Sequence, residues 1–139
     1  MRLQKARERL ERHAERRDII NDMIENYKDM REELMSGGGI RYDMPKIQAS
    51  PGDWITRKII KLADYERAIK KERAKYDRES EALSREIARL ENHNEREILI
   101  RYYFKNESAS NISKALNLNR TSVFRIMRRA ESHLDTLPR

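Results

Sequence analysis

The stretch "NISKALNLNRTSVFRIMRRA", residues 111–130, reads as two short helices separated by a three-residue break. The break begins at Asn117, and asparagine is one of the few residue types other than glycine that tolerates a left-handed backbone. It ends at Asn119, whose short polar side chain is suited to capping the second helix. The stretch therefore predicts a helix, a tight turn and a second helix.

The second of these helices is expected to have one apolar side and one basic side. At about 100° per residue, Thr121, Arg125 and Arg128 lie opposite the apolar residues. Residues 120–130 contain four arginines and no acidic residue, although the chain has 24 acidic residues. A solvated helix usually carries both signs, so this pattern favours a helix that binds a polyanion. The apolar side collects Val123, Ile126, Met127, Ala130 and Leu134.

A helix that reads the DNA major groove needs cations for phosphates, and bidentate arginine, hydroxyl or apolar groups for base edges. The first half of such a helix usually enters the groove. We therefore expect two sets of contacts to double-stranded DNA. The base contacts are Arg120, Thr121, Ser122, Phe124 and Arg125, and the phosphate contacts are Lys114, Arg128 and Arg129. The alternative is that the basic side is only a solvated helix face.

The stretch "SASNISKALNLNRTSVFRIMRRAESHL", residues 108–134, resembles the helix-turn-helix of sigma-factor region 4. Together with the preceding residues from 96, a long helix and a glycine-rich linker, it resembles phage late-gene transcription regulators of the RinA/ArpU type. That resemblance implies a small phage or prophage protein that activates late genes, with host RNA polymerase as a further partner. The positions that match the region 4 pattern are Ile112, Leu116, Val123, Arg125, Arg129, Ala130 and Leu134.

Upstream, apolar residues repeat every seven positions, which predicts long helices with a narrow contact stripe. The first segment, 1–36, ends at three glycines, and the second runs from about 51 to 91. A glycine-rich loop at 36–50 between them predicts an antiparallel helical hairpin. We expect this stalk to associate into a homodimer or tetramer. The sequence leaves open whether the apolar stripe packs within one chain or between chains. The expected oligomerisation residues are Ile55, Ile59, Leu62, Ile69, Tyr76, Leu83, Ile87 and Leu90.

The predicted fold is therefore all-α, with a hairpin stalk at 1–93 followed by a small helix-turn-helix domain at 94–139. Ser50, Pro51 and Asp53 form the expected start of the second long helix. Asn94, with Glu97 three residues later, forms the expected start of the next helix.

Composition excludes several classes of protein. The net charge is +7 and the pI about 9.8, which favours nucleic acid as partner. The chain has no cysteine, no run of eighteen apolar residues and no apolar signal region at its start, so we expect a cytoplasmic protein without membrane contact, inside a bacterial host if phage-encoded. Its three histidines lack the spacing of a helical metal pair and are read as surface or stripe residues, so no metal, cofactor or catalytic residue is expected. Two other functions stay open, a small-terminase-like DNA-packaging subunit and a coiled-coil scaffold that does not bind DNA.

Overall fold

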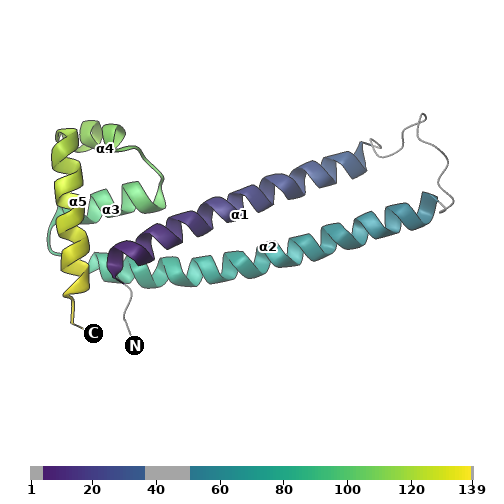
Figure 1. Ribbon diagram of the computed structural model, residues 1–139, viewed down its shortest axis with the longest axis horizontal. Coiled ribbons are helices and arrows are strands. Elements are labelled where there is room, and N and C mark those ends of the chain that lie inside the picture. Colours follow the sequence, from purple (N-terminus) through teal and green to yellow (C-terminus); the bar gives the residue numbers. More distant parts are fainter. Residues whose placement is uncertain (1–4, 37–50, 139) are drawn as a thin grey trace. The chain divides into compact units, whose positions relative to one another are not determined.

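The structure, a computed structural model, describes residues 5–36 and 51–138 (Figure 1). It is all-α: two long helices form an antiparallel pair, and short helices packed together follow them, as the sequence predicts. The predicted loop residues 37–50, including the cap Ser50, lie outside the described residues. The elements are α1 (Ala6–Met35), α2 (Pro51–Ala88), α3 (His93–Leu99), the π-helix η1 (Ile100–Phe104), α4 (Ala109–Leu116) and α5 (Arg120–Asp135).

The chain divides into two compact units. One, here called the core unit, comprises residues 1–17 and 76–139. The other, the hairpin unit, comprises residues 18–75. The core unit is larger than the predicted segment 94–139, because it also holds the first part of α1 and the last part of α2. Each unit is described separately below.

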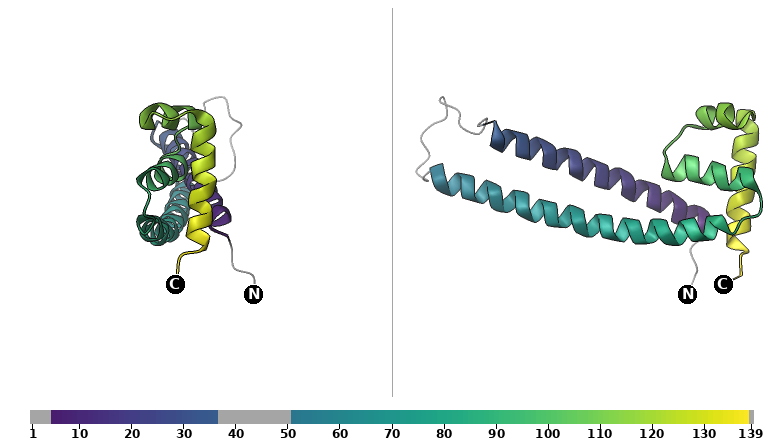
Figure 2. Two further views of the ribbon diagram at one scale, coloured as in Figure 1. Left: turned by 90° about the vertical axis from the view of Figure 1, so that its left-hand side faces the viewer. Right: turned by 180° about the vertical axis from the view of Figure 1, so that it is seen from behind.

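One continuous apolar core fills the core unit. Leu10 of α1 and Leu83 of α2 are almost fully buried, and they share this core with residues of α3, η1, α4 and α5. Within it, α5 packs against both α3 and α4, as two further views show (Figure 2). Three of the expected oligomerisation residues, Leu83, Ile87 and Leu90, are core residues here. At these positions the apolar stripe packs against other residues of the same chain.

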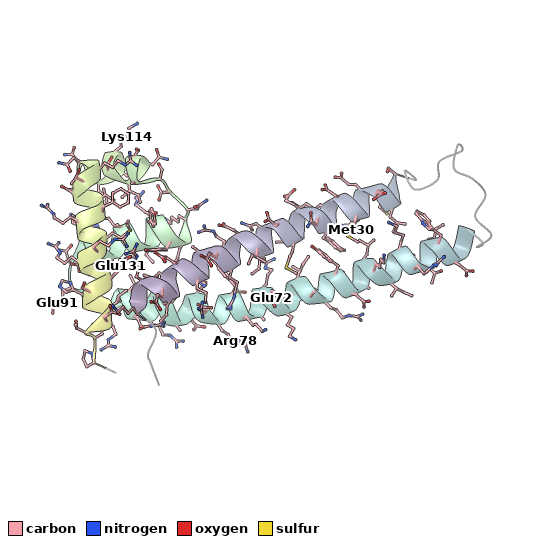
Figure 3. All side chains as sticks on the ribbon, viewed as in Figure 1. Met30, Glu72, Arg78, Glu91, Lys114 and Glu131 are labelled. Carbon is pink, nitrogen blue, oxygen red and sulfur yellow. The ribbon has the colours of Figure 1, made fainter. Side chains whose placement is uncertain are left out.

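The hairpin unit has a thinner interior. Ile20 of α1 and Ile69 of α2 are its buried apolar residues. The Tyr27 hydroxyl lies 3.5 Å from the Glu66 carboxylate of the facing helix. Met30 and Glu72, labelled in Figure 3, are half-buried. Few apolar side chains of this unit are therefore fully buried.

The stripe of α2 differs in detail from its predicted course. Leu62 and Ile69 face inward as expected, but Ile55 and Ile59 are 36% and 53% exposed. The half-buried neighbours of Leu62 and Ile69 on the inner side of α2 are Tyr65 and Glu72, whereas Glu66 and Arg73, one position later, are exposed. Both pairs contain charged side chains, so hydrophobic periodicity alone does not predict which pair lies on the inner side of the helix.

The junction before the short helices also differs. The cap of α3 is Asn92, whose side chain accepts a hydrogen bond from the Glu95 backbone N–H at 3.1 Å, and Asn94 lies inside the helix. After α3 the backbone widens into η1, where the Lys105 N–H donates to the Ile100 carbonyl at 3.0 Å. Arg17 of α1 donates to the Tyr103 carbonyl at 2.7 Å. Arg17 and Tyr103 are far apart in the sequence, so the local sequence around η1 does not predict this hydrogen bond.

None of the helices in residues 5–36 and 51–138 combines the length and apolar character that a bilayer crossing requires.

Candidate nucleic-acid interface

The turn between α4 and α5 has the predicted geometry. Ser108 caps α4, accepting from the Asn111 N–H at 3.1 Å. Asn117 ends α4 with φ 57° and ψ 45°, in the left-handed region, and the Leu118 N–H donates to the Ser113 carbonyl at 2.8 Å. The Asn119 side chain then caps α5 by accepting from the Ser122 N–H at 2.8 Å. The roles predicted for Asn117 and Asn119 are confirmed.

The apolar side of α5 is also confirmed. Val123, Met127 and Ala130 are completely buried, and Ile126 and Leu134 are nearly so. The opposite side therefore faces solvent along the whole helix. Of the expected base contacts, Arg120, Thr121 and Arg125 are exposed, while Ser122 and Phe124 are half-buried.

Two kinds of cation occur on this surface, and the first kind has no carboxylate partner. Arg125 and Lys114 form no side-chain hydrogen bond or ion pair with any described residue, and Thr121 forms none either. Lys114 is exposed on α4 (Figure 3). The Arg120 guanidinium lies over the Phe124 ring, 5.9 Å from its centroid, which is within the range of a cation–π contact. These groups are available to a ligand without first leaving an ionic partner.

The second kind of cation is paired with buried carboxylates. Arg129 donates from Nε to Glu95 of α3 at 2.9 Å, and Arg128 donates from Nη1 to Glu131 at 2.7 Å. The Glu95 and Glu131 side chains are only 2% and 5% exposed. Removing one partner of a buried ion pair typically costs about 3–5 kcal/mol, although here the arginines are partly solvated and the cost is smaller. Arg128 and Arg129 therefore contribute to the fold of the core unit.

Each buried glutamate has a second partner. The Tyr103 hydroxyl donates to Glu131 at 2.6 Å. Burial is the largest cause that raises the pKa of Tyr103, and this hydrogen bond is the second. His133 places Nδ1 3.0 Å from Glu95 Oε2. Sequence reasoning missed both glutamates. The burial of Glu131 could have been predicted, because this residue falls beside Met127 on the apolar side of α5. Nothing in the local sequence indicates that Glu95 is buried.

The histidines occupy separate places. His13 is buried on α1, His93 is the first residue of α3, and His133 is bonded to Glu95. No group of three or more histidine or carboxylate side chains in the described part of the chain is arranged to hold a metal ion.

The described residues thus define an all-helical protein in which a capped, basic helix is held against a small core. The family model described as "Protein of unknown function (DUF1492)" matches residues 52–135, more than half of the chain, and the chain belongs to that family. The match runs from α2 to α5 and leaves α1 outside. Neither a curated protein nor a solved structure matches the chain.

Proposed function

We propose that this protein is a transcription regulator that binds double-stranded DNA in a sequence-specific manner, with α4 and α5 as its helix-turn-helix. The observation that carries the proposal is the outer side of α5. It presents Thr121 and Arg125 to solvent without partners among the described residues, on a helix whose first eleven residues contain no acid. A helix of this chemistry satisfies phosphates and base edges together.

The roles within the site follow from exposure and pairing. Thr121 and Arg125 are assigned to base edges, with Arg120, Ser122 and Phe124 beside them at the start of the helix. Lys114, which has no ionic partner among the described residues, is assigned to a phosphate. The guanidiniums of Arg128 and Arg129 keep N–H groups beyond those bonded to glutamate, and their side chains are 43% and 50% exposed, so they reach phosphates while holding the fold.

The finer proposal concerns the biological setting. The resemblance to RinA/ArpU-type regulators supports a role as an activator of phage or prophage late genes, working with host RNA polymerase. The formal net charge of +7 supports the DNA-binding part of this proposal only.

A binding experiment with matched arginine variants tests the proposal. The recognised site is first isolated by footprinting the purified protein on genomic DNA. Arg125→Ala should then weaken binding to that site by about 1–3 kcal/mol, roughly 5- to 150-fold, and weaken binding to a scrambled duplex less. Lys114→Ala should weaken both duplexes alike and reduce the log–log salt slope by about one.

The control is Arg85→Ala on α2, which removes another exposed cation, outside the site, and should leave both affinities unchanged. The proposal fails if no genomic sequence is preferred over scrambled DNA. It also fails if Arg125→Ala and Arg85→Ala behave alike.

A further inference from the structure

We propose that each bound protomer selects one guanine of its DNA site, and that the Arg125 guanidinium reads this base through its N7 and O6 atoms. This role for Arg125 rests on the DNA-binding function proposed above, and it names the base that the site selects. It follows from which side chains of α5 are free of partners and from what those side chains can donate or accept.

Arg125 occupies the part of α5 that points most directly away from the core. It is exposed and lies about 160° around the helix from buried Met127. Its side chain forms no hydrogen bond or ion pair with any described residue. Thr121, about one helical turn earlier, is exposed on the same outer side. The whole set of guanidinium N–H groups of Arg125 is therefore free to meet a base edge.

Two of the other arginines of α5 are bound to carboxylates of the fold. Arg129 donates from Nε to Glu95 of α3 at 2.9 Å. Arg128 donates from Nη1 to both carboxylate oxygens of Glu131, at 2.7 and 3.2 Å. Both glutamates are buried, so they hold these guanidiniums against the flanks of the helix. Arg128 and Arg129 are thus less suited than Arg125 to extend into the groove.

The fourth arginine of α5 points in another direction. Arg120 is the first residue of the helix and lies about 140° around it from Arg125. Its guanidinium is placed over the Phe124 ring, 5.9 Å from the centroid. Arg120 and Arg125 therefore cannot read the same base, and only Arg125 shares the outer line with Thr121.

The chemistry of a free guanidinium selects guanine among the four bases. Arginine has five N–H donors in a planar fork and no acceptor. In the major groove, guanine presents two neighbouring acceptors, N7 and O6, whereas adenine presents one acceptor beside a donor. Thymine offers a single acceptor, and cytosine offers a donor. Two donors of the fork are thus satisfied together by guanine alone.

The other groups near the outer side of α5 are less selective. The hydroxyls of Thr121 and Ser122 both donate and accept, so they fit several bases. Asn119 is the one amide of residues 119–132, and its side-chain oxygen is engaged in the cap by the Ser122 N–H at 2.8 Å. Glu131 is the one carboxylate of this segment, and it is buried. Adenine and cytosine therefore lack the amide or carboxylate readers that suit them, and guanine is the one strongly selected base.

Base analogues test this assignment on the site isolated by footprinting. Each guanine is replaced singly by 7-deazaguanine, which lacks the N7 acceptor and still pairs with cytosine. For the wild-type full chain, one guanine per bound protomer should lose at least about fivefold in affinity, and the others should change little. In Arg125→Ala the same replacement should cost nothing further, because the partner of N7 is gone. The matched control Arg120→Ala should keep the full loss.

A second measurement covers the case in which Arg125→Ala binds too weakly to titrate. The full-length variant Arg125→Gln selects its preferred sites from duplexes randomised around the footprinted sequence. It should select adenine where the wild type selects guanine, because glutamine reads N6 and N7 of adenine. Helicity by circular dichroism should stay unchanged, since the Arg125 side chain is exposed and has no partner among the described residues.

Three results would overturn the role of Arg125. The first is a site in which no guanine is sensitive to the loss of N7. The second is a sensitive guanine whose loss is abolished by Arg120→Ala and kept in Arg125→Ala. The third is an Arg125→Gln variant that still selects guanine. In all three cases the wild type still prefers its genomic site to scrambled DNA, so the proposed DNA-binding function stands. Absence of any preferred genomic sequence would overturn both.

Discussion

At the scale of single residues, His13 is a fully buried ionisable group of the core unit. Its ring stacks on Tyr76 with centroids 4.1 Å apart and lies 5.3 Å from Phe104 of η1. Nε2 is 2.6 Å from the Ser80 hydroxyl, while Nδ1 has no hydrogen-bond partner in the described part of the chain and is 3.9 Å from Glu79. Burial lowers the pKa of His13, outweighing the raising effect of Glu79, and the nearby cations of Arg16 and Arg17 lower it further. The folded protein therefore holds this ring neutral.

This predicts a pH-dependent loss of stability. Because the pKa is lower in the folded than in the unfolded state, unfolding takes up a proton below the ordinary histidine value of 6.5. The free energy of unfolding should be highest above that pH, fall as the pH drops below it, and level off once the pH passes the folded value. The slope is at most about 1.4 kcal/mol per pH unit for one proton. Urea unfolding of His13→Phe should lack this fall, whereas the control His93→Gln should keep it. Equal slopes in both variants would refute the assignment.

At the scale of elements, the break between α4 and α5 shows how much one backbone conformation determines. Asn117 has φ 57°, and the second positive φ among non-glycine residues of the described chain is Asn106, at 56°, after η1. Asparagine adopts this conformation at low cost, which is why both helices end where they do. The direction of α5, and so the position of its basic side, depends on this turn.

Substitution at the turn should therefore separate conformation from chemistry. Asn117→Ala should lower the free energy of unfolding by about 1–2 kcal/mol, because the left-handed backbone conformation is sterically unfavourable for alanine. Asn117→Gly should be neutral or stabilising, because glycine has no Cβ atom. The control Asn111→Ala, within helical α4, should be neutral or stabilising since alanine favours a helix. Chemical denaturation of the three variants measures this, and a similar loss for Asn111→Ala would count against it.

At the scale of the whole molecule, the core unit joins segments from both ends of the chain. Leu10, Leu83 and Leu90 come from the long helices, yet they lie in the core that supports α5. The stability of the proposed DNA-binding helices is therefore inseparable from the first turns of α1 and the last turns of α2.

Two shortened chains test this. A chain in which Arg17 is joined to Tyr76 by a short Gly-Ser linker keeps the whole core unit and should unfold cooperatively. The linker has little distance to span, because His13, about one helical turn before Arg17, stacks on Tyr76. The fragment 94–139 loses the packing of the long helices and should show no cooperative thermal transition by circular dichroism. A cooperative transition in the fragment would show that α3 to α5 need no support.

Much of this protein can be predicted from the sequence. The all-α class, the two long helices, the Asn117 turn, the Asn119 cap and the apolar side of α5 all follow from periodicity and local backbone preference. Such features depend on residues a few positions apart, and a single sequence contains them in full.

Other features depend on contacts between distant segments, and only the tertiary structure decided them. It placed Leu83, Ile87 and Leu90 inside the chain's own core, paired Arg129 with Glu95 across two helices, and brought Arg17 to the Tyr103 carbonyl of η1. It also made the core unit from both ends of the chain. A charged or apolar side chain has the same local pattern whichever partner it meets, so its partner is fixed only when the helices pack.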